Sequence, residues 1–184
     1  MGYELHPETP PGGVPLEAYL PDAAGAGRYV KDFAARFGLE IDPPARMSST
    51  RRALAAAQVA RRMGKLEAFR AAAFDAYWRG GSALTSDREI AALARAAGLD
   101  EAPLVAAASD PARLDEVDAA RARARSEGVM GIPTFDFVAD DGRGLRVVGC
   151  QPLEVLAEAA RRAGASRRAR SGMSPVPRPG PRSA

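Results

Sequence analysis

The clearest feature of the sequence is a long central stretch in which apolar residues recur at helical spacing. From residue 50 to residue 127 this pattern predicts a block of successive helices. Gly64 divides a first helix, "RRALAAAQVARRM", from a second, "KLEAFRAAAFDAYWR". The sequence therefore predicts four to five helices in this block.

Local signals mark where several of these helices begin and end. Ser86 and Glu89 have the spacing of a capping box, in which each side chain accepts a backbone N–H at the start of a helix. Gly98 is placed to end that helix. Asp110 and Pro111 begin another, because proline at the first helical position loses no needed hydrogen bond. We expect that helix to run to about residue 127.

The segment before the helical block is less regular. Residues 2–5 alternate apolar and polar side chains, as a strand would. The following "HPETPPGGVPLEAYLPD" is rich in proline and glycine, so we expect it to be mostly irregular. Residues 26–37 have the spacing of a helix, with Gly38 at its end.

After Gly128 the pattern changes from helical to alternating. Residues 134–138 and 145–148 predict two strands, and the turn "ADDGRG" between them favours an antiparallel hairpin. Residues 152–162 predict a last helix. The order of elements is thus strand, helix, helical block, strand, strand, helix. This is most of an α/β, thioredoxin-like fold that carries a helical insertion at about 50–127.

Length and charge place the chain among globular proteins with a basic end. Its 184 residues are enough for one domain with a real core, which we assign to residues 1–164. The formal net charge is +3, but five arginines and no acidic residue follow residue 164, which leaves about −2 for the rest. We expect residues 165–184 to be a disordered Pro/Arg tail. Without a basic folded face we expect no specific nucleic-acid binding.

Targeting signals and cysteine usage suggest a compartment. The N-terminal residues lack the basic and apolar regions of a secretory signal, and no run approaches the roughly 18 apolar residues of a membrane span. The single cysteine, Cys150, cannot form an intramolecular disulfide. These features agree with a cytoplasmic protein that does not bind membranes.

Three segments together resemble a known family. They are "GYELHPETPPGG", "GVMGIPTFDF" and "VVGCQPLEVLAEA". In that order and spacing the chain resembles the DsbA-like thioredoxin family over about residues 2–163. The branch it resembles contains FrnE-type proteins and 2-hydroxychromene-2-carboxylate isomerases. The resemblance implies a second core strand with its loop, a proline turn with a cis peptide, and a last strand leading into the last helix.

The same resemblance implies that a βα unit is missing before residue 2. In the family that unit supplies the central strand and the Cys-x-x-Cys helix, or a serine in the isomerases. We expect the true start to lie upstream, with a degenerate, non-catalytic remnant as the alternative. A vacant central position would leave buried backbone groups unpaired, at about 1–3 kcal/mol each. The sheet would otherwise rearrange, or another chain would fill the position.

The resemblance implies few site residues. Pro133 would fix the loop beside the reactive sulfur and present the backbone of Ile132 to an extended substrate. From the residues alone, Pro133 is more simply a proline that begins a strand, where its missing N–H does no harm. His6, the only histidine, corresponds to a position that is structural or near the substrate groove, and alone it excludes a catalytic triad or a multi-histidine metal site. We expect Cys150 to be a small buried structural residue before a helix.

The resemblance thus implies a truncated DsbA-family protein-disulfide oxidoreductase homologue, and the single cysteine predicts that it is inactive by the dithiol route. That route needs an attacking and a resolving thiol, so the chain offers no catalytic residue for it. The expected partner is a thiol-containing protein or glutathione, and glutathione is the one cofactor left open. One alternative is an isomerase of the kappa glutathione-transferase-like type. Another is a non-catalytic helical module that binds a peptide. The oligomeric state cannot be read from the sequence.

Overall fold

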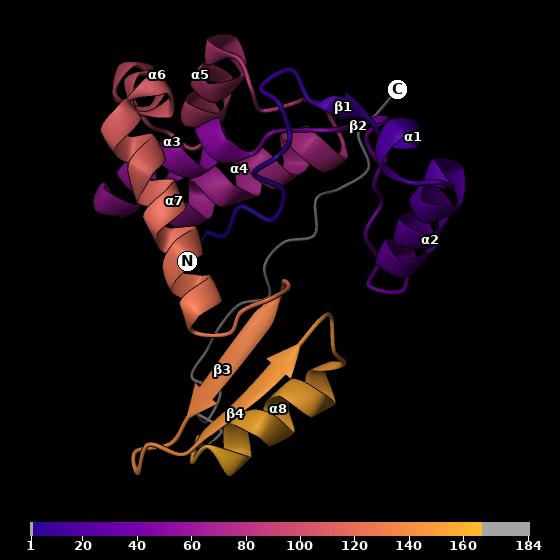
Figure 1. The fold of residues 1–184 in the computed structure, drawn as a ribbon, viewed down its shortest axis with the longest axis vertical. Helices are drawn as coiled ribbons and strands as arrows, with labels where there is room; N and C mark the ends of the chain where they lie inside the picture. Colours follow the sequence, from indigo (N-terminus) through magenta and orange to yellow (C-terminus); the bar gives the residue numbers. More distant parts are fainter. Residues whose placement is uncertain (1, 167–184) are drawn as a thin grey trace. The chain divides into compact units, whose positions relative to one another are not determined.

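The protein divides into two compact units, Met1–Met130 and Gly131–Ala184. A computed structural model describes residues 2–166 (Figure 1). Each unit has its own packing and is described by itself. The tail expected at residues 165–184 lies outside the described residues except for its first two positions.

The first unit begins with short elements rather than the strand expected at residues 2–5. Its elements are β1 (Val14–Pro15), α1 (Leu16–Tyr19), α2 (Ala23–Ala35) and β2 (Arg46–Met47), and β1 pairs antiparallel with β2. No strand forms at residues 2–5. The prediction of a strand there is wrong. The alternation suggested that the apolar side chains are covered, but the charged Glu4 is 2% exposed and the apolar Leu5 is 39% exposed.

Helix α2 begins three residues earlier than the spacing predicts. The carboxylate of Asp22 accepts the backbone N–H of Gly25 at 2.7 Å and so caps the helix. The aromatic residues Tyr29, Phe33 and Phe37 lie at helical spacing, and neighbouring rings contact each other. Tyr29 and Phe37 are nevertheless 68% and 63% exposed.

The helical block consists of five helices, as the pattern predicts. They are α3 (Arg51–Arg62), α4 (Leu66–Trp78), α5 (Asp87–Ala96), α6 (Glu101–Ser109) and α7 (Pro111–Ser126). Figure 1 shows α3 between α4 and α6, with α7 crossing beside them. The buried core comprises Ala53, Ala56, Ala60, Phe69, Leu84, Ile90, Leu93, Ala94, Ala97, Leu104 and Ala108. Because most of these side chains are alanines, the helices approach closely and a few large residues fill the remaining space.

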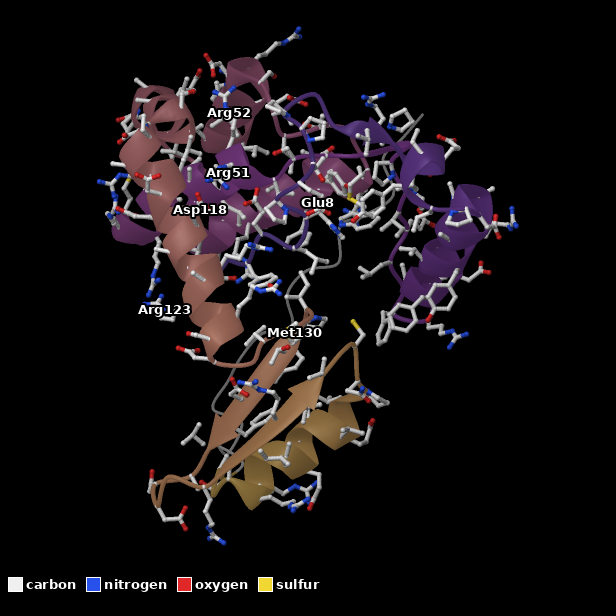
Figure 2. All side chains as sticks on the ribbon, viewed as in Figure 1. Glu8, Arg51, Arg52, Asp118, Arg123 and Met130 are labelled. Atoms are coloured by element: carbon white, nitrogen blue, oxygen red, sulfur yellow. The ribbon has the colours of Figure 1, made fainter. Side chains whose placement is uncertain are left out.

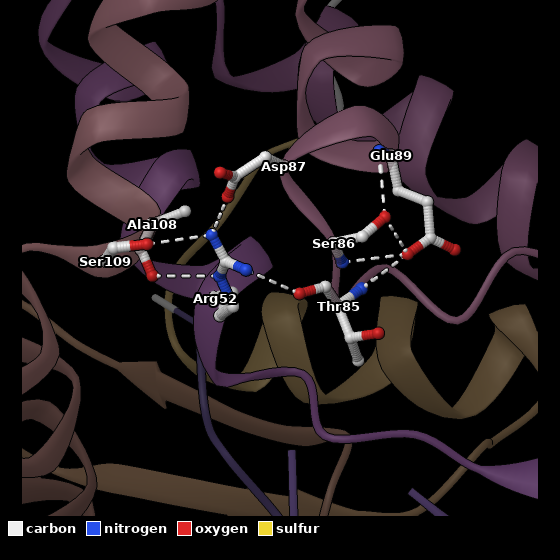
Figure 3. Close-up of polar contacts among 7 residues, drawn as sticks. All are labelled: Arg52, Thr85, Ser86, Asp87, Glu89, Ala108 and Ser109. Carbon is white, nitrogen blue, oxygen red and sulfur yellow. Dashed lines mark hydrogen bonds and ion pairs between the residues drawn. The ribbon is translucent and has the colours of Figure 1, made fainter. Parts of the chain in front are cut away.

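Helix α5 starts at the capping box predicted from the sequence. The hydroxyl of Ser86 accepts the N–H of Glu89, and the Glu89 carboxylate accepts the N–H of Ser86 at 2.9 Å (Figure 3). The same carboxylate also accepts the N–H of Ala83 at 2.7 Å and of Thr85 at 3.0 Å. Burial alone raises the pKa of Glu89, but the hydrogen bonds from Ser86, Ser82 and Thr85 outweigh it and lower the pKa to about 2.

Arg52 connects three helices through its guanidinium. It donates to the carbonyl of Thr85 at 2.7 Å, to the carbonyl of Ala108 at 3.2 Å and to the hydroxyl of Ser109 at 2.8 Å. It also forms an ion pair with Asp87 (Figure 3). Arg52 therefore fixes α3 to the start of α5 and the end of α6.

Arg51 connects the N-terminal segment to the helical block. Its Nη1 donates to Glu4 Oε2 at 2.9 Å and to Asp118 Oδ1 at 2.8 Å. Figure 2 shows Arg51 and Asp118 close together, on α3 and α7. The hydrogen bonds from Arg51 lower the pKa of Asp118. Because Glu4 is buried, its charge depends on Arg51 for compensation.

The second unit is a hairpin with one helix, as the sequence predicts. Strand β3 (Thr134–Val138) pairs antiparallel with β4 (Gly144–Val148), and α8 (Leu153–Arg162) follows and contacts β4. The half-buried side chains of one face are Phe135, Phe137, Leu145 and Val147. On the other face Asp136 and Arg146 form a bidentate ion pair, with N···O distances of 2.7 and 3.0 Å.

The core of the helical block predicts a large difference between two phenylalanines of α4. Phe69 is 1% exposed and Phe74 is 58% exposed. We expect Phe69→Ala to lower the free energy of unfolding by about 3–5 kcal/mol, because it leaves a cavity in the core. Phe74→Ala should cost much less. Urea unfolding of both variants checks this, and equal losses would mean that the core is not where the structure places it.

The Glu89 cap predicts a dependence of stability on pH. Because folding lowers the pKa of Glu89 from 4.5 to about 2, its contribution is complete above 4.5 and is lost as the pH falls toward 2. We expect Glu89→Gln to be less stable at neutral pH and to lose less stability over that range. Glu67→Gln is the control, because its side chain is 83% exposed. Identical pH profiles for Glu89→Gln and the unsubstituted chain would contradict the cap.

Candidate active site at the proline turn

The turn that precedes β3 is held by two hydrogen bonds. The hydroxyl of Thr134 donates to the carbonyl of Gly131 at 2.6 Å. The N–H of Gly149 donates to the carbonyl of Pro133 at 2.8 Å. The peptide bond between Ile132 and Pro133 is cis. The turn is therefore fastened both to its own strand and to the end of β4.

The two residues predicted to bind a substrate lie on the surface of this turn. Ile132 is 49% exposed, and Pro133 is also exposed. Among the described residues, the backbone N–H and C=O of Ile132 make no hydrogen bond to another backbone group. An extended chain alongside the turn could therefore bond to both groups, as it would to the edge of a sheet.

Cys150 is exposed, so the prediction that it is buried is wrong. The physical reason is the end of β4. Gly149 has φ +83°, a left-handed conformation that turns the chain out of the strand. The N–H of Gly149 donates to the carbonyl of Pro133, and Cys150 is the next residue along the chain. The thiol therefore follows directly the residue that is hydrogen-bonded to the turn. The pairing of the predicted hairpin could have indicated this, since it places residue 149 opposite residue 133.

This end of the hairpin thus combines an exposed thiol with exposed backbone groups. The sequence contains no second cysteine, so these residues can form a mixed disulfide but not an internal one. Sequence reasoning identified the turn but not the position of the thiol beside it.

His6 belongs to the first unit and has close partners there. Its Nδ1 contacts Tyr19 Oη and lies 3.1 Å from Glu8 Oε1, and the hydroxyl of Tyr19 donates to Glu8 at 3.0 Å. The hydrogen bonds that Glu8 accepts from its own backbone, Tyr19 and His6 lower its pKa, and burial followed by the bond to Glu8 raises the pKa of Tyr19. Only Nε2 of His6 is left for a ligand. No local pattern indicates that Tyr19 contacts His6, because 13 positions separate the two residues.

Other kinds of site find little support in the described residues. A cavity of about 400 Å³ lies between α4 and α5 in the first unit, and the Glu89 carboxylate that lines it is already used by the cap. Within residues 2–166 no group of three or more His, Cys, Asp or Glu side chains could hold a metal ion. No helix in that range is long and apolar enough to cross a membrane.

The sequence was compared with models of known protein families. The model of the DSBA-like thioredoxin domain matches residues 3–161. The chain belongs to the DsbA-like thioredoxin family. Its fold is accordingly the thioredoxin-like α/β fold predicted from the sequence, with a block of helices between its N-terminal part and its hairpin.

A solved structure with the same fold supports the assignment. The chain is similar to a probable DsbA oxidoreductase from Streptomyces coelicolor, with 27% sequence identity and a TM-score of 0.74. The similarity covers 94% of this chain and 77% of that one. No curated protein matches the chain.

Proposed function

We propose that this chain is a DsbA-family protein-disulfide oxidoreductase homologue of the FrnE-type branch, and that it binds a thiol-containing protein or glutathione at the proline turn. The observation that carries the proposal is the end of the β3–β4 hairpin. There the exposed Ile132 and Pro133 lie beside a residue with an exposed thiol, Cys150. Membership in the DsbA-like family supports the reaction class.

Binding would use the backbone of the turn. The proline ring restricts the backbone of the residue before it to extended conformations, so Pro133 limits the orientations of the carbonyl and amide of Ile132. An extended peptide or the γ-glutamyl-cysteinyl backbone of glutathione could hydrogen-bond to both groups. Such main-chain contacts give affinity with little demand on the ligand's side chains.

The chemistry open to these residues is a single exchange. The Cys150 thiolate attacks one sulfur of a disulfide, forms a mixed disulfide with it, and releases the other sulfur as a thiolate. A second thiolate must come from outside the sequence to attack the mixed disulfide and restore Cys150. Dithiol exchange by these residues alone is therefore not proposed. The cytoplasm is the proposed compartment, because a reducing environment keeps a lone thiol free.

Binding at the turn can be tested apart from the exchange. We expect S-methylglutathione, which has no free thiol, to shift the backbone amide resonances of Gly131, Ile132 and Thr134 in a saturable way. Pro133→Ala frees the φ of the turn, so we expect the dissociation constant to rise roughly 5–30-fold, the equivalent of about two hydrogen bonds.

The matched control is Pro152→Ala, the same substitution in the same unit at the start of α8. It should leave the dissociation constant unchanged. The proposal is wrong if the shifts lie elsewhere, or if both proline variants weaken binding equally.

A further inference from the structure

The cavity between α4 and α5 lies wholly within the helical block of the first unit. Ala76 of α4 and Ala92 and Leu93 of α5 form its apolar wall. Its volume of about 400 Å³ is within the range of about 300–1,000 Å³ that is typical of pockets for small molecules. Such pockets are mostly apolar and carry a few polar groups that orient the ligand. The kind of ligand therefore depends on the two charged side chains of the lining, Arg88 and Glu89.

The Glu89 carboxylate has no capacity left for a ligand. It accepts hydrogen bonds from the hydroxyls of Ser82 and Ser86 and from the four backbone N–H groups of residues 83–86. Figure 3 shows the bonds from Thr85 and Ser86. A carboxylate has about four lone-pair sites, so these bonds saturate it. A cationic ligand would therefore find no acceptor on this carboxylate.

The same hydrogen bonds fix the loop that borders the cavity. Leu84, inside this loop, has φ +58° and is 6% exposed. A left-handed backbone is unfavourable for leucine and persists only where the surrounding contacts determine it. The border of the cavity is thus in place before a ligand binds, which lowers the cost of binding.

Arg88 is the charged side chain of the lining that can still bind a ligand. It is exposed in the first turn of α5, and it forms no hydrogen bond or ion pair with another described residue. Its acidic neighbours are engaged elsewhere, because Asp87 pairs with Arg52 and Glu89 binds the loop. A guanidinium presents a planar fork of N–H donors that matches a carboxylate. The cavity thus combines an apolar wall with an unpaired positive charge.

We infer that this cavity binds a small apolar carboxylic acid, whose carboxylate pairs with Arg88 and whose hydrocarbon part lies against Ala76, Ala92 and Leu93. A neutral ligand would leave the guanidinium without a partner. A fully polar anion would leave the apolar wall in contact with water. The site belongs to the first unit, so it does not depend on the binding proposed at the proline turn.

Titration of the full 184-residue chain with octanoate, followed by its backbone amide resonances, tests the inference. We expect saturable shifts at Ala76, Ser82, Ala92 and Leu93. Octan-1-ol has the same chain length without the charge, and acetate has the charge without the long chain. Each should bind at least about tenfold more weakly than octanoate, because it makes only one of the two kinds of contact.

Substitutions test the two parts of the site separately. Arg88→Gln removes the charge from an exposed position and should raise the dissociation constant of octanoate about tenfold. The matched control is Arg125→Gln, which removes an exposed arginine of α7 in the same unit and should leave that constant unchanged. Ala92→Leu fills part of the cavity and should also weaken binding about tenfold, although Arg88 is still present.

Four results would overturn the inference. The first is a set of octanoate shifts that do not saturate or that lie outside the lining. Equal binding of octan-1-ol would mean that the cavity does not select a charge, and equal binding of acetate would mean an adventitious ion only. Equal affinity of the Arg88→Gln and Arg125→Gln variants would mean that Arg88 does not hold the carboxylate.

Discussion

The register between β3 and β4 is the constraint on which the candidate site depends. A shift by one residue would move Phe135 and Phe137 to the solvent face and Asp136 to the covered face. The same shift would break the bond between Gly149 and Pro133 that fastens the turn. The register that places two phenylalanines on the half-buried face is thus also what places an exposed thiol beside an exposed turn.

The first unit is organised by different interactions. Its two short strands contribute few ladder bonds, and two neighbouring arginines at the start of α3 make the long-range connections. Arg51 donates hydrogen bonds to the carboxylates of Glu4 and Asp118. Arg52 donates to the backbone carbonyl groups of Thr85, before α5, and Ala108, near the end of α6. Because a buried ion pair is costly to break on one side, the contact between Arg51 and Glu4 holds the segment before β1 to α3.

Much of this fold could be predicted because its signals are local. The capping box at Ser86 and Glu89, the proline at the start of α7 and the alternation of β3 each depend on residues within one turn or strand. The burial of Glu4 could not be predicted in this way, because it depends on an arginine 47 positions away. The alternation at residues 2–5 therefore predicted a strand where none forms.

The candidate site was predictable to the same extent. The turn at Ile132 and Pro133 follows from a local motif, but the exposure of Cys150 follows from the conformation of Gly149 and from its partner across the hairpin. The contact between His6 and Tyr19 likewise joins the N-terminal segment to the end of α1, an approach that no periodicity reveals. Local patterns thus identified the elements, and pairing between elements decided which side chains reach the surface.

On the proposed function, the proline turn holds a substrate beside a lone thiol that can exchange once but cannot complete a dithiol cycle. The most direct test is a single-turnover reaction of the reduced chain with a disulfide-bonded peptide, without added thiol, followed by non-reducing mass spectrometry. The account predicts that a mixed disulfide between the peptide and Cys150 accumulates and that Cys150→Ser forms none. Release of peptide with both thiols free would contradict it.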